Sequence, residues 1–245
     1  MRRVSLQPAY VLHRRSYRET SFLVELFTPE YGRLTLTAKG ARQTKSTAQG
    51  LLQPFTPLLI SWAGKGELMT LTQTDAHGAR RHLKGDALFA GFYLNELMMA
   101  LLERWDAHPL LFNAYDQALT ALQAVPLNQQ ALRSFEKTLL EELGYGLLTN
   151  ENIAHNVSFV PDKYYRFVPE LGFVISELGE EAKDKPNLFS GASLLSIVNS
   201  DWEHIDSMRD AKRLTRFVLA PLLGNRTIHS RKLFMQPLEA KINEE

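Results

Sequence analysis

Short apolar runs separated by turn residues occupy residues 1–75 of the chain. The run 33–38 alternates leucine with threonine, as a strand with one buried face does. The fourth run contains Pro54 and Pro57, which cannot donate to a strand ladder, so we expect this strand to be bent or at an edge. Five strands of this length fit a small closed barrel, and the OB-fold is one such barrel. The strands are predicted at residues 9–15, 21–27, 33–38, 51–63 and 67–74.

The rest of the chain shows patterns typical of helices. Residues 83–105 and 109–124 are predicted as helices, and a third helix begins at a good N-cap, Asn128, and ends at Gly144 and Gly146. Residues 164–176 resemble a hairpin, residues 200–203 have the spacing of a capping box, and a final helix is expected from about Met208 to Leu223. The third helix carries an apolar stripe of Leu132, Phe135, Leu139, Leu140 and Leu143.

The predicted fold class is therefore α+β. An N-terminal five-stranded OB-fold barrel, residues 1–80, is followed by a mainly helical domain, residues 81–150. We expect residues 151–245 to form a C-terminal part that carries the hairpin and the basic final helix and packs on the helical domain.

Charge is distributed unevenly along this chain of 245 residues. Residues 1–80 hold 11 Lys/Arg and 5 Asp/Glu, whereas residues 81–150 hold 5 and 8. A basic first module beside an acidic middle indicates a polyanionic partner for the first module. The absence of cysteine excludes disulfides, thiolate catalysis and cysteine-zinc modules, and it fits a reducing cytosol. No apolar run approaches the roughly 20 residues of a membrane span, and no secretory signal is recognisable at the N-terminus.

The segment LTAKGARQTKSTAQG, residues 36–50, is basic and contains no acid. A nucleotide-binding P-loop would need a second glycine directly before Lys45, and none is present. A solvated basic loop is the plain alternative. A small barrel would nevertheless keep its cations close enough to line a groove for a sugar-phosphate backbone, with Tyr17, Phe55 or Trp62 near it, although Phe55 and Trp62 fit the core better. The candidate DNA-binding residues of the barrel are Arg14, Arg15, Arg18, Arg33, Lys39, Arg42, Lys45 and Lys65.

The final helix places its apolar and basic residues on opposite faces. The apolar stripe of Ala211, Leu214, Val218 and Leu222 is the face expected to pack. The basic face can be a solvated surface, because Asp206 and Asp210 can pair with the arginines three residues on. A second anion-binding surface is the alternative that the later basic residues favour. Its candidate residues are Arg209, Lys212, Arg213, Arg216, Arg231 and Lys232.

We expect no catalytic residues. The seven histidines are scattered, and no Ser/His/Asp arrangement has a recognisable spacing. Glu141 and Glu142 are adjacent on a helix, so their side chains point apart. We predict neither an enzyme nor a cofactor.

Several segments of the sequence resemble those of one known protein family. FTPEYGRLTLTAKGARQTKS, LLQPFTPLLISWAGKGEL, GFYLNELMMALL, ALRSFEKTLLEELGYG and GNRTIHSRKLF occur in order over nearly the whole chain. They are similar to the RecO family of bacterial DNA repair and recombination mediator proteins, specifically its gammaproteobacterial branch. Many relatives carry a four-cysteine zinc module after the helical domain, but this chain has no cysteine, and His155 alone cannot make a metal site.

The resemblance implies a function in DNA repair and recombination after DNA damage. It implies an OB-fold protein that binds single- and double-stranded DNA and anneals complementary strands. In the RecFOR pathway such a protein acts with RecR to load the RecA recombinase on strands coated by single-strand-binding protein. We expect it in the cytoplasm at the nucleoid, as a monomer without membrane contact.

The resemblance also implies a peptide site. The family binds the C-terminal tail of single-strand-binding protein, of the type ending Asp-Asp-Asp-Ile-Pro-Phe, through an arginine that corresponds to Arg133. A carboxylate-terminated tail needs an arginine fork beside an apolar slot, and we expect Leu132 and Phe112 as apolar neighbours. Two other functions stay open: an RNA-binding accessory protein with the same fold, and a protein adaptor whose basic loop is only solvated.

Overall fold

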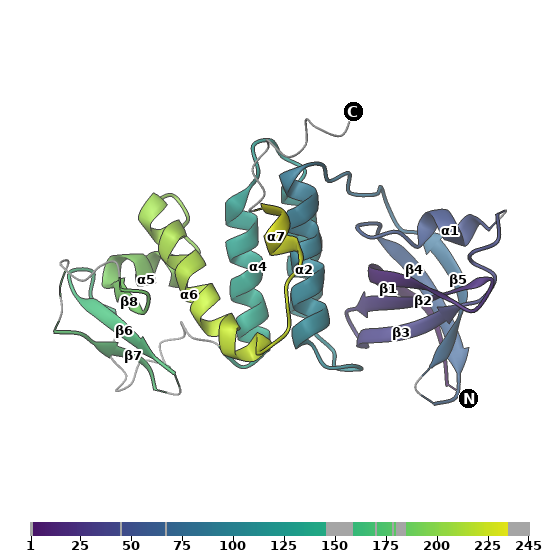
Figure 1. Ribbon diagram of the computed structural model, residues 1–245, viewed down its shortest axis with the longest axis horizontal. Coiled ribbons are helices and arrows are strands. Elements are labelled where there is room, and N and C mark those ends of the chain that lie inside the picture. Colours follow the sequence, from purple (N-terminus) through teal and green to yellow (C-terminus); the bar gives the residue numbers. More distant parts are fainter. Residues whose placement is uncertain are drawn as a thin grey trace. The chain divides into compact units, whose positions relative to one another are not determined.

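A computed structural model describes residues 2–44, 46–66, 68–145, 159–169, 171–177, 179 and 185–234 (Figure 1). They form two compact units. The first contains the chain up to Asn128 and the segment that starts at Thr227, and the second contains Gln129–Arg226. The predicted division near residues 80 and 150 stays a prediction.

Five strands of the first unit close into a barrel in the order β1-β2-β3-β5-β4. Antiparallel pairs form every seam except β3–β5, where Leu36 pairs with Met69 and Thr37 with Thr70 in parallel. This barrel is the predicted OB-fold, and fully buried leucines of the alternating run, Leu34 and Leu36, fill its core. The strands are β1 (Arg2–Tyr17), β2 (Ser21–Thr28), β3 (Gly32–Ala38), β4 (Leu58–Gly64) and β5 (Met69–Ala76).

The fourth predicted strand was placed too early. Residues 51–63 do not form one strand, because Thr47–Leu51 is a short helix, α1, and β4 begins only at Leu58. Pro54 and Pro57 lie in the intervening segment and lack the N–H that a ladder requires. The chain here is held by its carbonyls instead, since Pro57 and Phe55 accept from the backbone of residues 77 and 81.

Two predicted helices pack on the barrel within the first unit. They are α2 (Asp86–Leu101) and α3 (Pro109–Ala121). Buried Asn95 of α2 donates to the Leu12 carbonyl at 2.9 Å and accepts from the Tyr115 hydroxyl at 2.5 Å. These bonds satisfy polar groups that burial would otherwise leave unpaired, and they join β1, α2 and α3.

A short unpredicted helix, α7 (Ser230–Phe234), lies against α2 (Figure 1). The Glu96 carboxylate accepts from the Ser230 backbone N–H at 3.0 Å and from its hydroxyl at 2.8 Å. The Arg231 guanidinium lies 5.2 Å from the Tyr93 ring centroid and donates to the Tyr93 hydroxyl. The segment after residue 226 is therefore part of the first unit.

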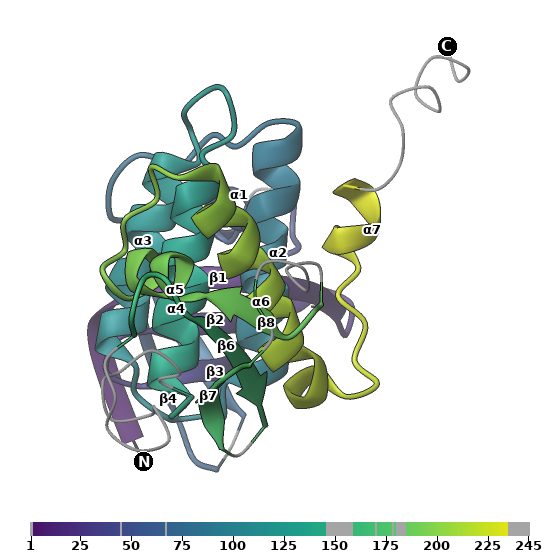
Figure 2. The ribbon, with the colours of Figure 1, turned by 90° about the vertical axis from the view of Figure 1, so that its left-hand side faces the viewer.

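The described residues of the second unit form three helices and a three-stranded sheet. The predicted third helix is α4 (Gln129–Glu142), and the predicted hairpin is β6 (Tyr164–Val168) with β7 (Gly172–Ile175). A third strand, β8 (Leu188–Ser190), pairs with β6 and leads into α5 (Gly191–Val198), as Figure 2 shows. The final helix, α6 (Ile205–Leu223), packs against α4 and α5.

The predicted capping box at residues 200–203 is wrong. The α6 helix begins two residues later, at Ile205, and its N-cap residue His204 makes no side-chain cap bond. The Glu203 N–H donates instead to the Asp201 carboxylate, so the segment forms a local turn before the helix. The apolar stripe predicted for α6 is otherwise buried at Ala211, Leu214 and Val218.

Candidate functional site

One end of the barrel gathers cations from separate loops. The loop after β3 is tied to the β1–β2 turn, because the Arg42 backbone N–H donates to the Thr20 carbonyl and its guanidinium to the Arg18 carbonyl, each at 2.9 Å. Arg18 lies 5.2 Å over the Tyr17 ring. Arg15 and Lys39 are exposed, and Lys45 lies outside the described residues. The predicted basic loop therefore shares one barrel end with the turn after β1.

Arg14 lies near Arg80, a cation that was not among the residues predicted from the sequence. Its guanidinium donates to the Gln49 carbonyl of α1 at 2.9 Å and lies 4.7 Å from the Phe22 ring centroid. Burial lowers the Arg14 pKa, and the neighbouring Arg80 lowers it further. Exposed Arg80 thus belongs with these cations, although in the sequence it lies in the GARRH segment between the predicted barrel and helical domain. We define the barrel-end cluster as Arg14, Arg15, Arg18, Lys39, Arg42 and Arg80.

Two predicted DNA-binding residues lie elsewhere on the barrel. Lys65 follows Gly64, which pairs with Arg2 at the start of β1, whereas the cluster gathers around the other end of β1, where Arg14 and Arg15 lie. The Arg33 guanidinium lies 3.8 Å from the Glu25 carboxylate and donates to the Leu102 carbonyl at 3.2 Å. Arg33 therefore has protein partners already. The core positions expected for Phe55 and Trp62 are confirmed, since their exposed fractions are 2% and 0%.

The basic face of α6 borders a cavity of about 540 Å³. Its lining residues are Pro186, Arg209, Lys212, Arg213, Arg216 and Phe217. The predicted ion pairs are both present, Arg209 with Asp206 and Arg213 with Asp210, each at 3.0 Å. Arg213 is further engaged, because it donates to the Leu188 carbonyl and lies 4.6 Å from the Phe189 ring centroid. Lys212 and Arg216 are the exposed cations of α6 best placed for an outside anion.

Arg231 and Lys232 belong to the first unit and not to the unit that contains α6. Arg231 lies in the first unit, against Tyr93, as described above. The side chain of Lys232 is outside the described part of the structure.

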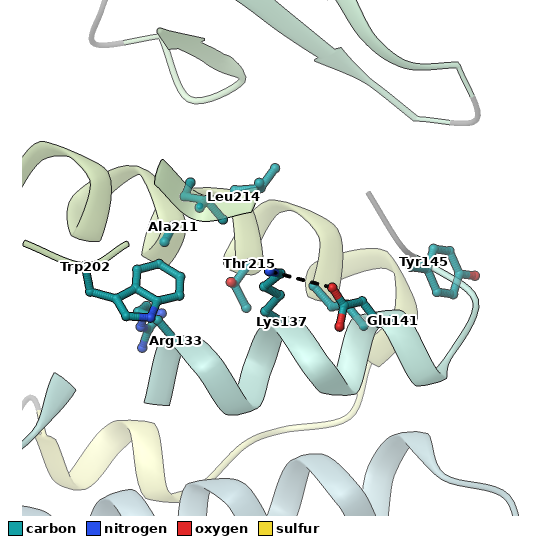
Figure 3. A pocket seen from close by; sticks show the side chains of 10 residues that line it. Arg133, Lys137, Glu141, Tyr145, Trp202, Ala211, Leu214 and Thr215 are labelled. Carbon is teal, nitrogen blue, oxygen red and sulfur yellow. Dashed lines mark ion pairs between the residues drawn. The ribbon is translucent and has the colours of Figure 1, made fainter. Parts of the chain in front are cut away.

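A narrow slot between α4 and α6 contains Arg133. Its volume is about 30 Å³, roughly the space of one water molecule. Figure 3 shows Trp202 and Arg133 at one end, Glu141 and Tyr145 at the other, and Lys137 between them. Apolar side chains line the α6 and α5 sides, so a buried arginine does lie beside an apolar slot. The complete lining is Arg133, Lys137, Leu140, Glu141, Tyr145, Ile197, Trp202, Ala211, Leu214 and Thr215.

Polar bonds fix the walls of this slot. The Trp202 indole N–H donates to the Ser134 hydroxyl at 3.0 Å, and the Lys137 ammonium donates to the Val198 carbonyl at 2.6 Å. The Arg133 guanidinium lies 2.6 Å from the Glu136 carboxylate, and both side chains are buried. The arginine is thus held at the slot, but it is already paired.

The apolar neighbours expected for Arg133 are not in the slot lining. Leu132 is buried on α4 but does not line it. Phe112 belongs to the first unit, where its ring packs against Tyr10 and Phe27 at 5.6 and 5.7 Å between centroids. The apolar part of the lining comes instead from Ile197, Trp202 and Leu214. In the sequence, Trp202 was noted only as part of the predicted capping box.

Among the described residues, no group of three or more His, Asp or Glu side chains is placed to hold a metal ion. No helix in the described part of the chain is long and apolar enough to span a membrane. His155 lies outside the residues that the structure describes.

Comparison with known proteins covers most of the chain. Residues 1–80 match the family model "Recombination protein O N terminal", and residues 82–232 match "Recombination protein O C terminal". A protein of Coxiella burnetii (strain RSA 331 / Henzerling II) named "DNA repair protein RecO" is 41% identical over 232 residues, which cover 95% of this chain and 98% of the relative. A protein of the same name from Dechloromonas aromatica (strain RCB) is 43% identical over 237 residues, or 96% of each chain.

Proposed function

This chain belongs to the RecO family of DNA repair and recombination proteins, and we propose that it is a non-enzymatic mediator that binds DNA and the single-strand-binding protein tail. The observation that carries this proposal is the separation of two kinds of surface. Exposed cations gather at the barrel end and on α6, whereas the buried arginine lies beside an apolar slot.

The barrel-end cluster and α6 would bind single- and double-stranded DNA through phosphates. The exposed cations Arg15, Arg18, Lys39 and Arg42 can each neutralise a phosphate without leaving a buried acid unpaired. Two such surfaces on one molecule would hold two strands and favour annealing by screening their charges. Binding would weaken as the salt concentration rises. On single strands, the slope of log affinity against log salt concentration would be about −0.7 for each phosphate that the protein neutralises.

The Arg133 slot would bind the C-terminal tail of single-strand-binding protein. The C-terminal carboxylate of the tail would accept hydrogen bonds from the Arg133 guanidinium. The terminal phenylalanine of the tail would contact the Trp202 side of the slot. Because the slot measures only about 30 Å³, a side chain of its wall must move for a phenyl ring to enter. Tail binding would bring the protein to coated strands, where with RecR it would promote RecA loading. We expect the protein to act as a monomer in the cytoplasm, at the nucleoid.

Fluorescence anisotropy with two probes tests this proposal. One probe is a labelled single-stranded oligonucleotide, and the other is a nine-residue peptide ending Asp-Asp-Asp-Ile-Pro-Phe. Arg133→Ala should lose the peptide and keep the oligonucleotide, and Lys39→Ala/Arg42→Ala/Lys45→Ala should do the reverse. Circular dichroism of each variant checks its fold. If wild type binds neither probe at micromolar concentration, the proposal is wrong.

A further inference from the structure

The partner that Arg133 already has suggests how its affinity for a tail is set. Arg133 and Glu136 lie one turn apart on α4, and the guanidinium nitrogen and carboxylate oxygen are 2.6 Å apart. Their side chains are 9% and 1% exposed, so water screens this charge pair weakly. Arg133 lines the slot, and the carboxylate of Glu136 therefore already engages the arginine that a tail carboxylate would need.

A second cation, from α6, lies near the same pair. The Lys212 pKa is lowered by burial and by the neighbouring cations Arg216 and Arg133, while Glu136 opposes that shift. Glu136 thus lies near two cations, Arg133 and Lys212. Another acid of α4, Glu141, lines the slot itself, is 44% exposed and lies 3.9 Å from Lys137. It shares the helix with Glu136 but is paired with the lysine and not with Arg133.

We propose that Glu136 acts as an internal competitor of the tail carboxylate for Arg133 and so limits how tightly the slot binds a carboxylate-terminated peptide. A second carboxylate on Arg133 would come within a few ångströms of Glu136 in a poorly screened place, which costs free energy. Binding then requires the Arg133–Glu136 pair to open or to be shared. This inference rests on the proposed function, because it assigns a role to Glu136 at the same tail site.

The inference predicts a dependence on the terminal charge of the peptide. Glu136→Gln keeps the shape of the side chain and removes its charge, so a peptide with a free terminal carboxylate should bind about tenfold more tightly, which corresponds to about 1.4 kcal/mol. The same peptide with an amidated C-terminus has little to gain, and its affinity should change by about twofold or less. A merely structural role of Glu136 would change both affinities together.

The experiment measures both peptides by anisotropy on five full-length proteins: wild type, Arg133→Ala, Glu136→Gln, Glu136→Asp and the matched control Glu141→Gln. Glu136→Asp keeps the charge and withdraws it from Arg133, so it should give a smaller gain and remains a test if Glu136→Gln does not fold. Glu141→Gln removes one negative charge from the same slot and should leave the preference for the free acid close to that of wild type.

The outcomes separate this inference from the proposed function. If Arg133→Ala does not weaken the free-acid peptide, the tail site itself is wrong. If Arg133→Ala abolishes binding but Glu136→Gln weakens the free acid, or shifts both peptides equally, then the tail site stands and the competitor role is overturned. An equal gain from Glu141→Gln would also overturn it, since general electrostatics would then explain the effect.

Discussion

Tyr10 on β1 donates a hydrogen bond of 2.5 Å to the Asp116 carboxylate on α3, which also pairs with Arg81 at 2.9 Å. The bond joins the barrel to the helices of the first unit across 106 residues of sequence. Tyr10→Phe keeps the buried ring and leaves Asp116 its arginine. We expect a loss of about 1 kcal/mol in the free energy of unfolding, measured by urea denaturation. An unchanged midpoint and slope would contradict this contribution.

The same tyrosine predicts a pH dependence. Burial raises the Tyr10 pKa above its ordinary value, and the bond to Asp116 raises it further. The unfolded chain loses this proton near pH about 10, whereas the folded chain keeps it to higher pH. The stability from Tyr10 is therefore full below about pH 10 and is lost above it. The difference in Tm between wild type and Tyr10→Phe should shrink as pH rises beyond that value. Tyr115 is present in both proteins, and its pKa is raised mainly by its own burial, which the substitution keeps.

The two arginines Arg33 and Arg42 should differ in their effect on DNA binding. Arg42→Ala removes an exposed cation of the barrel-end cluster, so single-stranded DNA affinity should fall and its salt slope should decrease by about 0.7. Arg33→Ala instead removes one of the two arginines paired with Glu25 and the bond to the Leu102 carbonyl, so it should lower Tm and leave the salt slope unchanged. Anisotropy titrations at several salt concentrations and thermal denaturation would measure both. A decreased slope for Arg33→Ala alone would reverse this assignment.

The α6 surface should contribute to DNA binding independently of the barrel. Lys212→Gln/Arg216→Gln removes two exposed cations that border the α6 cavity, and the salt slope on single strands should decrease by up to about 1.4. The matched control is Arg166→Gln, an exposed arginine on β6 of the same unit that does not line the cavity. Equal slopes for both variants would mean that α6 is a solvated face.

Gly32 should tolerate no side chain. Its φ is +59°, and a Cβ built there would lie 1.6 Å from the Asp106 carbonyl oxygen. We expect Gly32→Ala to cost about 2–4 kcal/mol in unfolding free energy, because backbone must move as well as adopt a strained φ. Gly66 is the control, with φ +76° and no atom within 4 Å of its Cβ, so Gly66→Ala should cost only about 1 kcal/mol. Similar losses at both glycines would show that the contact with residue 106 relaxes easily.

The barrel could be predicted because its determinants are local. The alternation of leucine and threonine in β3 and the turn residues around it act over a few positions. The errors occurred where local patterns compete with longer-range bonds. The run before Leu58 is as apolar as a strand, but its prolines and the bond from residue 77 to the Pro57 carbonyl decide its course. The SDWE segment has the residues of a capping box, yet Asp201 bonds to Glu203 before the helix starts.

The charged residues of the candidate sites could be predicted from the sequence, but the residues that surround them from other elements could not. The arginines of α6 and their aspartates follow from helical spacing alone, and both ion pairs are present. The apolar side chains opposite Arg133 come from α5, α6 and the segment between them, which a pattern on α4 cannot reveal. Arg80 likewise joins Arg14 only through the folding of the barrel, since 66 positions separate them in the sequence.

The bond between Glu96 and Ser230 has a consequence for biosynthesis. Its partners are 134 residues apart, and the whole second unit is encoded between them. The ribosome therefore releases all of Gln129–Arg226 before the residue that completes the packing of α2 has been made. Domains can fold as units during synthesis, so the second unit can fold before α7 has been synthesised and packed on α2 of the first unit. The barrel is thus translated before the second unit, whereas the helix that packs on α2 is translated after it.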